Sequence, residues 1–150
     1  MAIRKLSLEN DPILHKPCRE VTNFDERLNI LMDDLRDTMR ASNALGLAGP
    51  HIGILRRIIS IEAEEGLIEI INPIIIKQLG VQMETERSVS CPRDRIVTVR
   101  PMEVTVRGND RVGNVIEAHG IGLSARILCH EIDQVNGIFF KEKAASILGH

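Results

Sequence analysis

From residue 56 to residue 120, short runs rich in isoleucine and valine alternate with segments rich in glycine, proline, asparagine and charged residues. Runs of about four to eight β-branched residues bounded in this way are typical of β-strands. The turn-rich segment "GNDRVGN" predicts a hairpin between the last two of these runs. The strands predicted are "RRIISIEA", "LIEIINP", "IIIKQLG", "RIVTVRP", "EVTVRG" and "VIEAHG". This pattern predicts a mostly antiparallel β region.

One amphipathic helix is predicted on each side of the strands. In "NFDERLNILMDDLRDTMRAS", apolar side chains recur every three or four residues, and Asn23 or Asp25 is a plausible N-cap. Those apolar residues are Leu28, Leu31, Met32, Leu35 and Met39. From about residue 123 to residue 136, Leu128, Ile132 and Val135 share a helix face, and Asn136-Gly137 ends it. We therefore expect a single α+β domain over residues 1–150, with "ALGLAGPHIG" as a loop.

Composition excludes several classes of protein. The chain has no Trp, no Tyr and three Phe, so a stacking platform for single-stranded nucleic acid is not expected. A net charge of −2 gives no attraction to nucleic acid or to an anionic membrane. The three cysteines lack CxxC spacing, which indicates reduced thiols. The first residues lack the apolar run of a signal peptide, and we expect a soluble, cytoplasmic protein with a small or peptidic ligand.

The segment "LCHEIDQVNG" carries an incomplete metal motif. In HExxH, two histidines share a helix face and bind zinc or iron, with the glutamate beside them. Here His130 and Glu131 are present, but the position of the second histidine holds Gln134.

Three segments together resemble the motifs of peptide deformylases, written GxGLAAxQ, EGCLS and QHExDHxxG. They are "ALGLAGPHIG" (44–53), "ERSVSCP" (86–92) and "CHEIDQVNG" (129–137), in the family's order and spacing. The resemblance implies an α+β fold of small antiparallel sheets around a central metal-binding helix. It also implies hydrolysis of the formyl group from N-formylmethionine of new polypeptides.

The resemblance also implies a role for each motif position. The family's metal, commonly ferrous iron, is held by a cysteine and two histidines, which correspond here to Ser88, His130 and Gln134. The general acid and base corresponds to Glu131, and the glutamine that binds the developing oxyanion corresponds to His51.

The backbone N–H of Val89 is a second candidate for the oxyanion. The expected partner is an N-terminal formylmethionyl or methionyl peptide, with no direct nucleic-acid or membrane contact and a possible association with the ribosome. The predicted substrate-binding residues are Leu45, Gly46, Leu47, Ala48, Leu123 and Ile127. Only "IFFKEKAASILGH" follows Gly137, which leaves little room for a long C-terminal helix for ribosome contact.

The replaced ligands lead to competing hypotheses. A serine hydroxyl and a carboxamide are weak ligands, and their presence removes about 5 kcal/mol or more from a site whose full zinc affinity is roughly 10–16 kcal/mol. The favoured interpretation is therefore a deformylase-like protein with weak or no activity and no tightly bound cofactor. One alternative is a divergent, active deformylase that uses His130 and Glu131 with iron, zinc or nickel. Another is a non-catalytic peptide-binding or structural protein.

Three other residues, Cys91, Cys129 and His51, are candidates to replace the lost ligands. Cys91 and Cys129 are expected to point away, the first by strand alternation and the second by the rotation of about 100° per helical residue. His51 could approach the metal position from its loop. Arg100 or Arg95 could orient Glu86, or both could be exposed strand charges.

Overall fold

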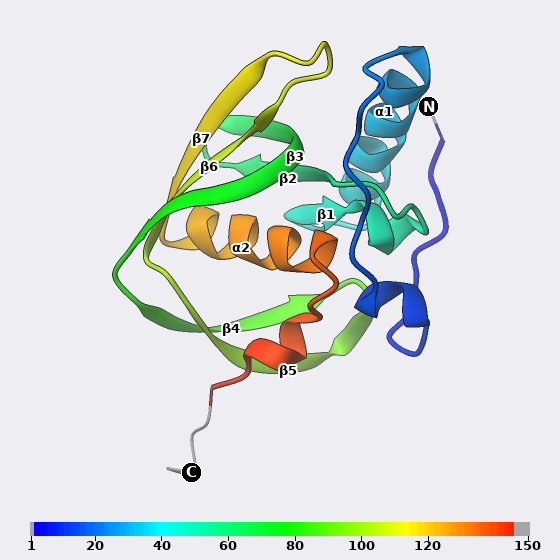
Figure 1. Ribbon diagram of the computed structural model, residues 1–150. Helices are drawn as coiled ribbons and strands as arrows, with labels where there is room; N and C mark the ends of the chain where they lie inside the picture. Colours follow the sequence, from blue (N-terminus) through cyan, green and yellow to red (C-terminus); the bar gives the residue numbers. More distant parts are fainter. Residues whose placement is uncertain (1, 146–150) are drawn as a thin grey trace.

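The computed structural model describes residues 2–145 and has two α-helices and two antiparallel sheets (Figure 1). The five-stranded sheet has the order β1-β2-β3-β6-β7, and the second sheet is the β4–β5 hairpin. The fold is therefore α+β, with the sheets around a central helix as predicted. The helices are α1 (Glu26–Ala41) and α2 (Leu123–Val135), with short 3-10 helices η1 (Pro12–His15), η2 (Gly49–Ile52) and η3 (Phe140–Lys143). The strands are β1 (Gly46–Ala48), β2 (Ile58–Ala63), β3 (Gly66–Leu79), β4 (Gln82–Ser88), β5 (Cys91–Arg100), β6 (Glu103–Asn109) and β7 (Val115–Ile121).

The larger sheet has one helix on each face: α1 packs against β1 and β2, whereas α2 crosses the other face from β1 to β7. Strand side chains alternate between faces, so Ile59 packs with α2 while its neighbour Ile58 packs with α1. The predicted apolar stripe of α1 is in the second of these clusters, and Asp25 is the N-cap, its carboxylate accepting from the Leu28 N–H. Figure 1 shows α2 between the larger sheet and the β4–β5 hairpin. This central position brings α2 into contact with every segment that forms the candidate site.

Two strand predictions need correction. The runs "LIEIINP" and "IIIKQLG" form one strand, β3, whose register shifts between Ile71 and Ile74. Asn72 adopts a positive φ of 56° there, and its side chain binds both the N–H and the carbonyl of Val21. Asn72-Pro73 therefore forms a bulge within β3 and does not end it.

The segment "ALGLAGPHIG" is more regular than the loop predicted. Gly46–Ala48 pairs with β2 as β1, and Gly49–Ile52 forms the 3-10 helix η2, in which Pro50 occupies an early position. The pairing partner of β1 is more than ten residues away, so local composition could not predict it. Within residues 2–145, no helix is long and apolar enough to cross a membrane.

Candidate functional site

A cavity of about 370 Å³ opens between α2, β1, η2 and the β4–β5 hairpin. This size is typical of a site for a small ligand or a short peptide. The predicted residues that line it are Leu45, Gly46, His51, Ser88, Val89, Leu123, Ile127, His130 and Glu131. The structure thus brings together residues from three segments that are distant in sequence, within 42–51, 85–92 and 123–131.

Three predicted site residues lie outside this lining. Leu47 and Ala48 are fully buried in the two hydrophobic clusters, on opposite faces of β1. Gln134 is also fully buried, on the side of α2 that faces η1, where its Nε2 donates to the Leu14 carbonyl over 2.7 Å. Leu47 and Ala48 therefore support the site by packing, without facing the cavity.

His130 is oriented by a buried ionic network. Its Nδ1 lies 2.9 Å from Oε1 of Glu86. The two oxygens of the Glu86 carboxylate also accept hydrogen bonds from two guanidinium nitrogens of Arg100 and from the Thr98 hydroxyl. Arg100 continues the network to Asp133 on α2. Burial opposes the charged form of Glu86, but its hydrogen bonds from His130 and Arg100 outweigh burial and lower its pKa to about 2.

Because Glu86 is ionised, it accepts and His130 Nδ1 donates. In the neutral ring this leaves the Nε2 lone pair of His130 for a ligand, which is the usual arrangement of a metal-binding histidine supported by a carboxylate. Burial lowers the pKa of His130, but the nearby Glu131 and Glu86 charges overcome burial and raise it. Arg100 orients Glu86, whereas Arg95 is exposed.

His51 is held as a neutral donor. The Ala48 N–H donates to its Nδ1 over 3.0 Å, so the ring proton is on Nε2. Burial lowers the pKa of His51 to about 3, and the charge of His130 lowers it further. The Nε2–H is buried and has no hydrogen-bond partner within residues 2–145. It can therefore donate to an acceptor in the cavity.

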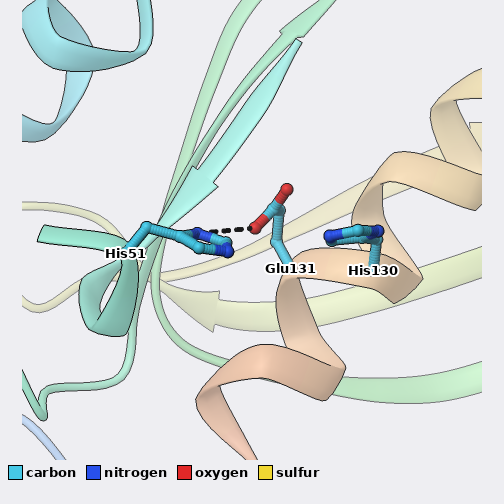
Figure 2. Close-up of side chains that lie close together, drawn as sticks. All are labelled: His51, His130 and Glu131. Atoms are coloured by element: carbon cyan, nitrogen blue, oxygen red, sulfur yellow. Dashed lines mark ion pairs between the residues drawn. The ribbon is translucent and has the colours of Figure 1, made fainter. Parts of the chain in front are cut away.

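Glu131 lies between the two imidazole rings in Figure 2, with Oε1 3.5 Å from Nδ1 of His51. One nitrogen of each ring and a Glu131 oxygen all lie within 4.8 Å of one another. Burial raises the pKa of Glu131 to about 7, against the opposing effect of His130. A carboxyl group with this pKa can take up and return a proton near neutral pH.

The thiols do not replace the lost metal ligands in the described structure. Cys129 is in the core cluster of α2, and Cys91 packs with Leu14, Phe139 and Phe140. Cys91 lies outside the cavity lining as predicted, but strand alternation is not the reason, because the chain turns after Ser88 and the two residues are paired across the β4–β5 hairpin. Cys91 nevertheless lies in a separate cluster of possible ligands, with Glu9 and Asp94.

The donor chemistry fits a divalent metal, although with a changed set of atoms. His130 offers Nε2, and the buried oxygens Oε1 of Glu131 and Oε1 of Gln134 have no hydrogen-bond partner among the described residues. Ser88 Oγ accepts from the Ser90 N–H over 3.2 Å and is a weaker candidate. In the family motif, the positions of Ser88 and Gln134 hold a thiolate and a second imidazole. Here both positions offer oxygen atoms instead.

Sequence reasoning missed two contributors. The Thr98 hydroxyl donates to Glu86 over 2.5 Å, and Arg126 lines the cavity from α2. The sequence could have predicted Thr98, because it lies two residues before Arg100 and a spacing of two places both side chains on one face of β5.

Comparison with known proteins agrees with this geometry. The family model for polypeptide deformylase matches residues 3–148. The peptide deformylase of Alkaliphilus metalliredigens (strain QYMF) is 46% identical over 143 residues, covering 95% of this chain and 97% of that protein. The peptide deformylase of Caldicellulosiruptor bescii is 42% identical, covering 95% and 86%.

Solved structures give the same result. The crystal structure of a peptide deformylase from Legionella pneumophila has a TM-score of 0.91 and 38% identity, covering 98% of this chain and 88% of that one. Peptide deformylase from Thermotoga maritima has a TM-score of 0.94 and 26% identity, covering 97% and 100%. With the motifs, the fold and the site in agreement, the chain belongs to the peptide deformylase family.

Proposed function

We propose that this chain is a metal-dependent hydrolase that removes the formyl group from N-formylmethionyl peptides. The observation that carries the proposal is Glu131, a buried carboxyl group with a pKa of about 7 that lies between His51 and His130 in the cavity. Close similarity to peptide deformylases over nearly the whole chain supports the same reaction. The expectation of weak activity and no bound cofactor gains no support from these comparisons.

The roles follow from the geometry. Glu131 takes a proton from the attacking water as oxygen bonds to the formyl carbon. It then passes the proton to the peptide nitrogen as the C–N bond breaks, which releases formate and a free amine. His51 Nε2–H, with the backbone N–H of Val89 as a second candidate, donates to the oxygen that gains negative charge. Leu45, Leu123 and Ile127 line a cavity that would accept the methionine side chain.

Peptide deformylases use a divalent metal, and His130 would hold it here. A bound divalent metal supplies Lewis-acid polarisation and lowers the pKa of water. The Glu86–Arg100 pair keeps the His130 ring in the orientation that this needs.

A second candidate is a peptide-binding protein with little or no turnover. Gln134 favours it, because its amide nitrogen is committed to the Leu14 carbonyl and its oxygen is a weak ligand. Ser88 favours it for the same reason, since its hydroxyl already accepts from the Ser90 N–H.

One experiment separates the two functions. Protein prepared without oxygen is loaded in turn with ferrous iron, nickel and zinc, and formate release from a formyl-Met peptide is measured. The hydrolase predicts metal-dependent release that Glu131→Ala abolishes. No release with any metal, together with calorimetric binding of a Met-peptide, would support the binding protein and exclude the hydrolase.

A further inference from the structure

The cavity lining includes two arginine side chains that have no role in the proposed reaction. They are Arg126 on α2 and Arg87 on β4, and neither forms an ion pair with a carboxylate among the described residues. The two acidic residues of the lining do not neutralise them, because Glu86 is bound to Arg100 and Glu131 is buried between two imidazole rings. The cavity therefore carries two positive charges that no carboxylate of the described chain compensates.

The guanidinium of Arg126 has more donors than partners. A guanidinium carries five N–H donors. The side-chain hydrogen bond that Arg126 forms is long, from Nη1 to the Thr85 carbonyl over 3.4 Å. Its Nε is buried and has no hydrogen-bond partner within residues 2–145. A buried donor without an acceptor is costly, so a ligand oxygen that binds this guanidinium removes that cost.

Arg87 adds a second charge on the same wall of the cavity. It lies two residues after Thr85 on β4, and both are exposed while Glu86 between them is buried, so both face the same side. Their Cα atoms are about 7 Å apart at the usual strand rise. Because Arg87 is exposed and also lines the cavity, its charge lies where the cavity opens to solvent. The family motif EGCLS has a glycine at this position, so the charge is a departure of this chain from that pattern.

Arg126 lies close to the groups that would hold the substrate. It stands between Leu123 and Ile127 on α2, which line the region proposed for the methionine side chain. It precedes His130 by four residues, a rise of about 6 Å along the helix. One residue of an extended peptide spans roughly 3.3–3.6 Å. A side chain one or two residues beyond the methionine therefore comes within reach of Arg126.

We infer that Arg126 and Arg87 bind a carboxylate side chain that follows the methionine, so that the preferred formylmethionyl peptides have aspartate or glutamate in one of the next two positions. Guanidinium and carboxylate groups form charge-assisted and often bidentate hydrogen bonds. Neutral peptides lose this contact, and basic peptides are repelled. The inference rests on the proposed function in placing the methionine in this cavity.

The first experiment compares peptides that differ only in charge. Formate release is measured for formyl-Met-Glu-Ala against formyl-Met-Gln-Ala, and for formyl-Met-Ala-Glu against formyl-Met-Ala-Gln, all with amidated C-termini. We expect kcat/KM to be about 10-fold higher for the acidic peptide in at least one pair, as for hydrogen bonds between charged groups. The difference should lie mainly in KM, because this contact forms equally in the ground state and in the transition state. A salt concentration of about 0.5 M should reduce the preference several-fold.

Substitutions test the two arginines directly. Arg126→Gln should reduce the preference to within about 2-fold, whereas Arg126→Lys keeps the charge and part of the preference. Arg87→Gln should reduce it by about 2- to 3-fold, since an exposed charge pair is weaker. The matched control is Arg93→Gln, which removes an exposed arginine of β5 outside the cavity lining and should leave the preference unchanged. Circular dichroism and thermal unfolding check that all variants are folded.

Two results would overturn the inference. One is equal kcat/KM for the acidic and neutral peptides of both pairs. The other is a preference that the double variant Arg126→Gln with Arg87→Gln leaves unchanged.

Two further comparisons separate this inference from its alternatives. Formyl-Met-Ala is tested with a free and with an amidated C-terminus, and a preference for the free terminus without one for acidic side chains would show that the arginines bind chain ends and would overturn the inference. Calorimetry with the corresponding unformylated Met-peptides measures the charge preference without turnover. A preference in binding that is lost in Arg126→Gln, without formate release under any metal, would support the inference and exclude the proposed hydrolase.

Discussion

His51 shows how one hydrogen bond decides what a side chain can do. The Ala48 N–H fixes the ring proton on Nε2, and burial keeps the ring neutral by lowering its pKa to about 3. A neutral imidazole with one defined N–H resembles the amide donor of glutamine, the residue that the family motif has at this position. His51 therefore presents an N–H donor to the cavity, and its only lone pair is already occupied by the Ala48 N–H.

We expect His51→Ala to lower kcat for formyl release by about 100-fold, since removing one oxyanion donor costs a factor of about 100 to 1,000. KM should change little, because the lost hydrogen bond strengthens only in the transition state. His51→Gln restores an N–H donor and should recover most of the rate. Steady-state kinetics on a formyl-Met peptide measure both variants. Equal losses in His51→Gln and His51→Ala would contradict a donor role.

Asp34 gives the protein a pH-dependent contribution to stability. The Ala2 N–H donates to this buried carboxylate over 2.7 Å and is the main cause of its lowered pKa. Burial opposes this effect, and Arg4 adds to it through a hydrogen bond and its charge. Because the folded pKa is below the ordinary value of 3.8, the contribution is complete above that value. It is lost as the pH falls through the folded pKa.

Asp34→Asn should remove this part of the pH dependence. The difference in free energy of unfolding between the two proteins should shrink as the pH falls from about 5 to about 2. Urea titrations at a series of pH values give that difference. A constant difference across this range would show that the Asp34 carboxylate is not stabilised in the folded state.

At the scale of elements, β1 and α2 approach each other closely at the site. A Cβ at Gly46 would lie 2.7 Å from Cγ2 of Ile127 and 2.8 Å from Oε2 of Glu131. Only glycine lets the strand come this close to the helix. The position of the Glu131 carboxylate therefore depends on the absence of a side chain on the neighbouring strand.

Gly46→Ala should displace Glu131 and Ile127, whose side-chain ends can move while the backbone stays in place. We expect kcat/KM to fall by about 100-fold, because misplacing a reacting group by about 1 Å has effects of that size. The cost in stability should stay within about 1–3 kcal/mol, as for other overpacked positions. Kinetics and urea unfolding of the same preparation test the two parts. Unchanged turnover would show that Glu131 does not need its observed position.

At the scale of the whole molecule, α2 lies between two sheets that differ in size, one of five strands and one of two strands. Strands β2, β3 and β6 lie inside the five-stranded sheet and carry most of the buried isoleucine and valine. The hairpin β4–β5 has two strands and exposes Met83, Val97 and Val99. A two-stranded sheet is marginally stable without further packing, so this side of the site should open more readily.

Hydrogen exchange should reveal this difference. We expect the amides of β4 and β5 to open with free energies at least about 2 kcal/mol below those of β2, β3 and β6. A bound Met-peptide should slow exchange in β4 and β5, because Thr85 to Val89 line the cavity. Mass-spectrometric exchange with and without peptide measures both effects. Uniform protection across the two sheets would contradict the expectation.

Much of the fold follows from local pattern in the chain. The apolar period of α1 and α2 and the β6–β7 hairpin appear as predicted, because spacing and turn chemistry act within a few residues. The Ile-rich runs are also strands, although two of them join as β3. The three motifs likewise identified His130, Glu131 and His51 as residues of one site. These features need no knowledge of distant contacts.

The rest was decided by residues far apart in the chain. The single strand β3 depends on Asn72 binding Val21, and the hairpin that pairs Ser88 with Cys91 depends on packing against α2 and η3. The orientation of the Gln134 amide depends on the Leu14 carbonyl, which is 120 residues away. A side chain takes its protonation and orientation from the donors and acceptors packed around it. Those neighbours are brought together only when the chain folds. The sequence therefore predicts which residues form the site, but not which of their donor and acceptor atoms face the cavity.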